Sequence, residues 1–341
     1  MDFVSSYDVL EANLPFVLNN YQFISVIGKG SFSAAFEVVS IKHQTKMCAK
    51  VTLLDETIIQ SDGTIIDTEI YALLALSHPN IVKLYDVFVY NPYAIYILDL
   101  CVEGTVADEI FLYGRLSIIR ANEIMSGVLS ALKQCHESSI AHRDIKPSNI
   151  FLMQTGKPKL GDFGLSSFVT NKKGVTNACG SEYYCAPEMF KGSAFCPFKA
   201  DVYSLGITYY QILTGLLPRS EDVLFFPDYV DDRARTIILK MVDPSPEKRP
   251  SIKQLQEDPF FQKRIRINND GKIQSFLSSH ASATIFRPNI LPKLKQTLSP
   301  NSQNVVQPHE RPLSLIMSPK GTMNRRRQSY RGFIPQVTQP V

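Results

Sequence analysis

Four polar side chains in the middle of the chain have the types and spacing that phosphoryl transfer would need. The stretch HRDIKPSN contains Asp144, Lys146 and Asn149, and the following GDFG contains Asp162. Phosphoryl transfer needs an acceptor for the proton of the attacking hydroxyl and oxygen ligands for magnesium, because its transition state is stabilised mainly by position and charge. Asp144 is the candidate proton acceptor, and Asn149 and Asp162 are the candidate metal ligands.

A glycine-containing turn between the first two predicted strands is a candidate phosphate-binding loop. It reads Gly28, Lys29, Gly30, Ser31, Phe32 and Ser33. Glycine lets backbone amides approach a phosphate closely, but a glycine turn is also common in a plain hairpin. The turn alone therefore leaves both interpretations open.

Two charged residues nearby could complete a phosphate site. Lys50 ends CAK in a predicted strand, and Glu69 lies on the predicted helix that follows. The acid could hold the lysine ammonium toward an α- or β-phosphate. Either residue alone would more often be a solvated surface charge.

The elements that must position these residues change in type along the chain. Residues 21–54 read as strands rich in β-branched and aromatic residues, residues 64–77 as a helix, and residues 81–89 and 93–100 as two more strands. Helical patterns then follow at 106–111, 117–138, 201–214 and 231–242. This order predicts an α+β fold with a small antiparallel-sheet lobe, one helix, and a larger helical lobe.

Charge divides the chain into an acidic body and a basic tail. From Lys263 onward there are 13 Lys and Arg against two acids, and the remainder, 23 against 30, is acidic. The tail is rich in Ser, Pro, Asn and Gln, so we expect residues 263–341 to be mostly disordered. We expect residues 1–20 to form an N-terminal extension and residues 21–262 the folded domain.

The composition also limits the compartment and the partners. The six cysteines show neither a metal-ligand spacing nor a disulfide framework, no membrane anchor is evident, and the arginines near the end lack interleaved aromatic residues. We therefore expect a cytoplasmic or nuclear monomer that binds neither membrane nor nucleic acid.

A third motif, Ala186-Pro187-Glu188, follows HRDIKPSN and DFG along the chain. With these three motifs in this order, residues 21–261 resemble the eukaryotic protein kinases of the serine/threonine type. The resemblance implies ATP and Mg²⁺, protein substrates carrying Ser or Thr, and a Lys50–Glu69 ion pair. It also implies that Lys146 steadies the transferring phosphoryl group and that Ser181 contacts the catalytic loop. The subfamily stays open between calmodulin-dependent and never-in-mitosis-related kinases, and a catalytically inactive scaffold is the alternative function.

The resemblance further implies a hinge at residues 99–104 between an N-lobe, 21–98, and a C-lobe, 105–262. It places the residues around adenine at Ala35, Ala49, Leu98, Asp99, Cys101 and Phe151. It also implies two supports. These are a stack of Leu73, Leu84, His142 and Phe163 anchored by Asp201, and a Glu188–Arg249 ion pair.

Several positions depart from the family pattern. Ser33 replaces the third glycine and Ala35 a β-branched residue, which could weaken ATP binding. The segment from Pro218 to Pro227 is too short for the helix usually found there, so we expect that helix to be absent or vestigial.

A few residues bear on substrate choice and on regulation. Thr105, Ser148 and Gln211 are neutral where arginine-directed kinases carry acids, so we expect no requirement for an upstream arginine. Thr176 and Ser329 are candidate sites for another kinase. Docking of the basic tail on the acidic body is a further hypothesis, less favoured than a solvated tail.

Overall fold

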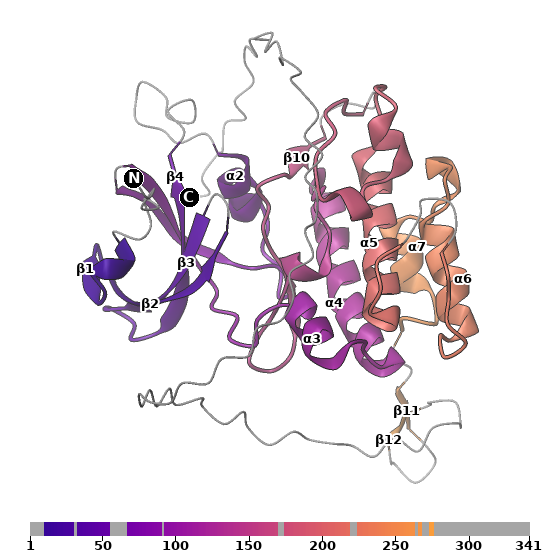
Figure 1. Ribbon diagram of the computed structural model, residues 1–341, viewed down its shortest axis with the longest axis horizontal. Coiled ribbons are helices and arrows are strands. Elements are labelled where there is room, and N and C mark those ends of the chain that lie inside the picture. Colours follow the sequence, from indigo (N-terminus) through magenta and orange to yellow (C-terminus); the bar gives the residue numbers. More distant parts are fainter. Residues whose placement is uncertain are drawn as a thin grey trace, which may run out of the picture. The chain divides into compact units, whose positions relative to one another are not determined.

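A computed structural model describes residues 10–30, 33–54, 67–90, 92–169, 174–218, 224–262, 265–267 and 273–275. Its N-terminal part is a six-stranded antiparallel sheet in the order β1-β2-β3-β4-β6-β5 (Figure 1). The strands are β1 (Phe16–Leu18), β2 (Tyr21–Lys29), β3 (Ser33–Ser40), β4 (Lys46–Leu53), β5 (Leu84–Tyr90) and β6 (Tyr93–Leu98).

Alternation of side chains fixes which face of this sheet is buried. Along β3 every second residue is buried, including Phe36 and Val38, and the partner strand β4 buries Ala49 and Val51. Because side chains alternate between the two faces of a strand, these residues form one apolar layer. The register pairs Ala35 with Lys50, so β3 and β4 bring the two predicted nucleotide-binding residues side by side.

The last residues of the predicted N-terminal extension form β1, which joins the sheet. Phe16 pairs with Phe23 of β2, and their rings stack with centroids 4.6 Å apart. Leu10 is buried in the same core. A three-residue strand carries too little sequence pattern to be separated from a loop, so β1 could not be predicted from the sequence.

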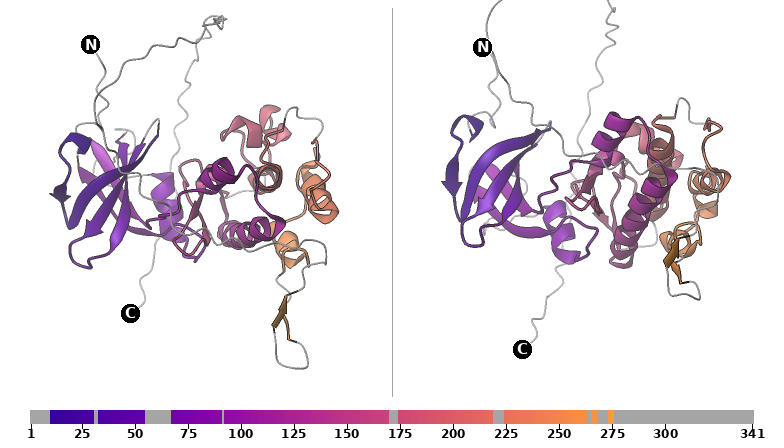
Figure 2. Two further views of the ribbon diagram at one scale, coloured as in Figure 1. Left: turned by 60° about the horizontal axis from the view of Figure 1, so that its bottom comes forward. Right: turned by 90° about the horizontal axis from the view of Figure 1, so that it is seen from below.

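Six helices are described, and all but α2 belong to the helix-rich part (Figure 2). They are α2 (Thr68–Ala75), α3 (Val106–Tyr113), α4 (Ile118–Glu137), α5 (Pro197–Thr214), α6 (Asp232–Met241) and α7 (Ile252–Glu257). Five of them begin at a side chain that accepts backbone N–H groups of the first turn. These capping residues are Asp67, Thr105, Ser117, Asp231 and Ser251.

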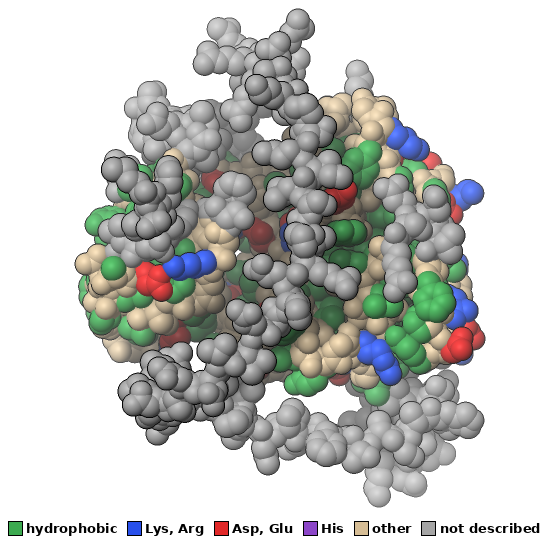
Figure 3. All heavy atoms as spheres, viewed as in Figure 1, with side chains coloured by type: hydrophobic (Ala, Val, Ile, Leu, Met, Phe, Trp, Pro, Cys, Tyr) green, Lys and Arg blue, Asp and Glu red, His purple; other side chains and the backbone are tan. Residues whose placement is uncertain are grey.

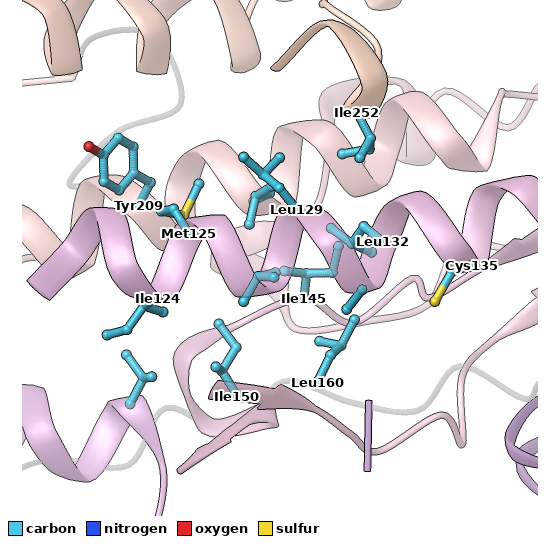
Figure 4. Close-up of a cluster of buried hydrophobic side chains, with 14 of the residues drawn as sticks. Ile124, Met125, Leu129, Leu132, Cys135, Ile145, Ile150, Leu160, Tyr209 and Ile252 are labelled. Atoms are coloured by element: carbon cyan, nitrogen blue, oxygen red, sulfur yellow. The ribbon is translucent and has the colours of Figure 1, made fainter. Parts of the chain in front are cut away.

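The core of the helix-rich part forms around α4 and α5. Figure 4 shows Ile145 beside α4, near Leu132, and Ile150, which follows Asn149, belongs to the same buried cluster. α5, which covers the helical pattern predicted at 201–214, is buried on nearly every side. In the described part of the chain, no helix is long and apolar enough to cross a membrane.

The connection between α5 and α6 holds no helix among its described residues, 215–218 and 224–231, as predicted for them. Residues 219–223 lie outside the described part. Phe225 and Tyr229 of this connection are 69% and 51% exposed. Hydrophobic side chains accordingly appear at the surface of the helical part beside charged ones (Figure 3).

Part of the predicted disordered tail forms a short hairpin. β11 (Ile265–Ile267) pairs with β12 (Ile273–Ser275) in an antiparallel register. The intervening sequence, Asn-Asn-Asp-Gly-Lys, contains the Asp-Gly pair typical of a hairpin turn, a signal that the tail's overall composition concealed. The rest of the tail, including Ser329, lies outside the described residues.

Candidate active site

The loop that carries Asp144 is hydrogen-bonded to a buried acid of α5. Asp201 is fully buried, and its carboxylate accepts the backbone N–H of His142 at 3.0 Å and of Arg143 at 2.8 Å. Arg143 has a φ of 68°, a strained value for a residue with a side chain. The two hydrogen bonds to Asp201 offset that strain and fix the direction in which the chain enters Asp144.

The Asp144 carboxylate is surrounded by donors. Asn149 Nδ2 donates to Oδ2 at 2.9 Å and to the Asp144 carbonyl at 2.8 Å. Lys146 Nζ lies 2.7 Å from Oδ2 and 2.7 Å from the Ser181 Oγ, and Ser181 donates its N–H and its hydroxyl to Oδ1, each over 3.0 Å. The predicted catalytic residues and Ser181 therefore form one connected group.

A second group brings together charged side chains from β4, from α2 and from the GDFG stretch. Lys50 Nζ lies 2.8 Å from both carboxylate oxygens of Glu69 and 3.0 Å from Asp162 Oδ1. Burial disfavours the charged form of Lys50, but the two carboxylates outweigh burial and raise its pKa. Burial also disfavours the charged form of Asp162, and Lys50 outweighs it, so the pKa of Asp162 is lowered. Both groups are charged at neutral pH.

His142 and Phe163 link the two groups. Their rings meet edge to face with centroids 4.7 Å apart, and His142 Nε2 bonds to the Gly161 carbonyl over 3.1 Å. Burial lowers the pKa of His142. Leu73 and Phe163 belong to one buried apolar cluster, and Leu84 is partly buried against that cluster.

The donor set suits a magnesium ion. Asp162 offers a charged, partly exposed carboxylate, and Asn149 uses its Nδ2 on Asp144, which leaves its amide oxygen as the possible ligand. Mg²⁺ prefers one or two protein oxygens with the remaining positions taken by phosphate and water. The described residues contain no cluster of three or more His, Cys, Asp or Glu that could hold a metal by themselves.

The predicted adenine site lies where β3, β4 and β6 meet the hinge. Ala49 and Leu98 are buried, and Ala35, Cys101 and Phe151 are half-buried. The side chain of Asp99 is bound to Lys159 at 2.9 Å and to the Tyr85 hydroxyl at 2.9 Å. Its backbone N–H donates to the Lys83 carbonyl over 3.1 Å, so the Asp99 carbonyl is the group that remains to serve a base.

The predicted phosphate-binding loop is described only in part. Gly28 pairs with Ala35, and the Gly30 N–H donates to the Ser33 carbonyl over 2.8 Å. Lys29 is paired with Glu11 at 2.6 Å. Ser31 and Phe32 lie outside the described residues.

Two residues that sequence reasoning missed adjoin the site. Asp67 caps α2 and also accepts the Tyr96 hydroxyl of β6 over 2.7 Å. An Asp before an apolar helical pattern is a capping signal. Its bond to a tyrosine 29 positions away could not have been read from the sequence.

A small antiparallel sheet joined to a helical lobe, with these two charged groups between them, defines a phosphotransferase of the protein kinase class. A comparison with protein families agrees. Residues 21–261 match the family described as "Protein kinase domain", so the chain belongs to the protein kinase family. The predicted α+β, two-lobed fold and the predicted family are confirmed.

The similar curated proteins are kinases. A "SNF1-like protein kinase ssp2" of Schizosaccharomyces pombe is 31% identical over 69% of this chain and 43% of its own length. A "Serine/threonine protein kinase OSK3" of Oryza sativa subsp. indica is 33% identical over 58% of this chain and 41% of its own length, and a "Putative CBL-interacting protein kinase 27" of Oryza sativa subsp. japonica is 30% identical over 71% and 64%. This chain thus spans less than two thirds of the length of these relatives.

Proposed function

We propose that this chain transfers the γ-phosphoryl group of ATP to Ser or Thr hydroxyls of protein substrates. The observation that carries the proposal is the pairing of Lys146 with both Asp144 and Ser181, at 2.7 Å each, beside a formed Lys50–Glu69–Asp162 group. The serine/threonine kinase named among the relatives supports the same acceptor class.

The roles follow from the contacts. Asp144 accepts the proton of the attacking hydroxyl, and its donors hold the carboxylate in the orientation needed for that transfer. Lys146 faces the same carboxylate and can pair with the charge of the transferring group. Lys50, fixed by Glu69, is placed to hold phosphate oxygens near Asp162. Mg²⁺ held by Asn149 and Asp162 would neutralise phosphate charge when bound.

The test is transfer of phosphate from labelled ATP with magnesium to a mixed protein substrate. Asp144→Asn should lower turnover by about 10²- to 10⁴-fold, the usual contribution of a general base, while nucleotide binding persists. Asp162→Asn should abolish transfer. Asp232→Asn, which changes an exposed acid at the start of α6, is the matched control. If the native chain binds ATP and labels no protein, a binding scaffold replaces this function.

Substrates without an upstream arginine fit the site best. Asp108 is an acid three residues after Thr105, one of the neutral positions named above. Its carboxylate accepts hydrogen bonds from the N–H and the hydroxyl of Thr105 at 2.8 and 2.7 Å, and so caps α3. Gln211 is neutral and accepts the Tyr184 hydroxyl. A peptide-array profile dominated by arginine three residues before the acceptor would contradict this preference.

The proposal has three further parts. An upstream kinase regulates the protein at Thr176 or Ser329. The protein acts as a monomer, in the cytoplasm or the nucleus. The charge pattern and the absence of a predicted anchor support the location. Arg143 bonds to the carbonyl of Asn177, the neighbour of Thr176, and so supports Thr176 as a phosphate site.

A further inference from the structure

The position of Glu69 depends on the first turn of a short helix. Glu69 is the second residue of α2, which has eight residues, and its side chain is buried. Helices shorter than about 12 residues are marginal by themselves, so capping and packing decide whether the first turn forms. Whatever fixes the start of α2 therefore also fixes the partner of Lys50.

Asp67 fixes that start from two directions. Its Oδ1 accepts the backbone N–H of Glu69 over 2.6 Å and of Ile70 over 3.4 Å, which caps the helix. Its Oδ2 accepts the Tyr96 hydroxyl over 2.7 Å. One carboxylate thus joins the helix to the sheet.

Tyr96 lies on the strand that also positions Lys50. It is 1% exposed, and in the register of β4 and β6 it stands directly opposite Lys50. Hydrogen bonds and strand pairing therefore close a ring that runs from Lys50 through Glu69, Asp67 and Tyr96 back to Lys50.

We propose that Tyr96 and Asp67 are positioning residues for phosphoryl transfer, because their hydrogen bond holds α2 against the sheet and so keeps Glu69 on Lys50. This inference rests on the proposed kinase function. Neither residue needs to touch nucleotide or substrate. Their effect passes through the Lys50–Glu69 pair.

The hydrogen bond between Tyr96 and Asp67 should be a strong one. Burial and the contact with Asp67 raise the pKa of Tyr96, so its hydroxyl stays a donor across the physiological range. A hydrogen bond to a charged group contributes more than a neutral one, and here it also opposes the repulsion between the nearby carboxylates of Asp67 and Glu69.

Two variants separate the tether from the cap. Tyr96→Phe removes the hydroxyl alone. Asp67→Ser keeps a good helix cap, but its single oxygen cannot serve the helix and Tyr96 together. Each should lower kcat/KM for ATP by about tenfold, the loss expected for one hydrogen bond to a carboxylate, and the double variant should lose little more than either alone. Tyr71→Phe, on the exposed side of α2, is the control and should keep native rates.

A second cycle tests whether the effect passes through Glu69. In a Glu69→Gln background, Tyr96→Phe should change the rate less than about twofold, because the pair it positions is already lost. Equal losses in the two backgrounds would overturn the proposal, and so would a native rate for Tyr96→Phe.

Hydrogen exchange in the full chain measures how firmly the first turn of α2 is held, and it does not depend on catalytic turnover. The first-turn amides of α2 should exchange about tenfold faster in Tyr96→Phe and Asp67→Ser than in the native chain, and at the native rate in Tyr71→Phe. If the native chain transfers no phosphate, the kinase function fails and this measurement still decides the tether. Unchanged exchange in Tyr96→Phe would refute it.

Discussion

The guanidinium of Arg249 donates to both carboxylate oxygens of Glu188, over 2.6 and 2.8 Å, and both side chains are buried. The remaining donors of Arg249 bond to the carbonyls of Asp243 at 2.7 Å and Lys199 at 3.0 Å. Each guanidinium nitrogen and each carboxylate oxygen of the pair therefore has a partner. The pair connects the segment after Ser181, which carries Glu188, to the residues between α6 and α7, which include Arg249. The sequence analysis expected this pair from the family resemblance alone.

Removing one member of this pair should destabilise the protein strongly. Glu188→Gln keeps the shape of the side chain but leaves the buried charge of Arg249 without its counter-ion, which typically costs about 3–5 kcal/mol. Urea unfolding followed by circular dichroism measures the change. The control is Glu37→Gln, which breaks the more exposed pair with Lys46 and should cost less than about 1 kcal/mol. Similar losses in the two variants would contradict the prediction.

The buried imidazole of His142 should make stability depend on pH. Its Nε2 bonds to the Gly161 carbonyl and its Nδ1 accepts the Asp144 N–H, an arrangement that only the neutral ring allows. Burial lowers its pKa in the folded protein. The unfolded chain therefore binds a proton that the folded chain does not as pH falls below about 6.5. Stability from this group is complete above that pH and is lost as pH falls further.

Unfolding at pH 7.5 and at pH 5.5 tests this dependence. His142→Phe keeps an aromatic ring against Phe163 and removes the proton-binding group, so its loss of stability between the two conditions should be smaller than the native loss by up to about 1.4 kcal/mol per pH unit. His43→Gln, in the exposed turn after β3, is the control. A native-sized pH dependence in His142→Phe would assign the effect to other groups.

The two charged groups could be predicted from the sequence because their spacing is tightly restricted. Asp144, Asn149 and Asp162 lie on loops whose shape is set by neighbours within the same motifs, and the structure brings them together as expected. The support from Asp201 also followed, through the family resemblance. Local sequence thus pointed to the residues that form the two charged groups.

The parts that sequence reasoning missed depend on contacts between distant, ordinary residues. Tyr96 reads as one more aromatic residue of a strand, and its partner is defined only when β4, β6 and α2 are assembled. β1 is too short to show alternation. The hairpin of β11 and β12 was hidden by the composition of the residues around it. In each case pairing partners, and not local propensity, decided the structure.

Phosphorylation of Thr176 should not be required for basal activity. Arg143 already donates to the Asn177 carbonyl, and the backbones of Val175 and Phe195 exchange two hydrogen bonds, at 3.0 and 2.9 Å. These contacts hold residues 175–177 in place without a phosphate. Thr176→Ala, and the native chain after phosphatase treatment, should each keep more than roughly a third of the native rate, a barrier change of under 1 kcal/mol. A loss of 100-fold would instead make the phosphate essential.

The bridge between Val175 and Phe195 can be tested through its glycine. Gly174 has a φ of 79°, and a Cβ there would lie 2.2 Å from the Phe195 carbonyl oxygen, so Gly174→Ala must push the two segments apart. Gly192 has a similar φ of 67° with nothing within 4 Å of a Cβ, so Gly192→Ala adds the same backbone strain without the clash. If the bridge orders the segment that carries Ser181, Gly174→Ala should lower kcat about tenfold or more, and Gly192→Ala should stay within about twofold of the native value. Equal rates for the two variants would show that the segment is held without the bridge, by Arg143 and the Asp144–Ser181 contacts.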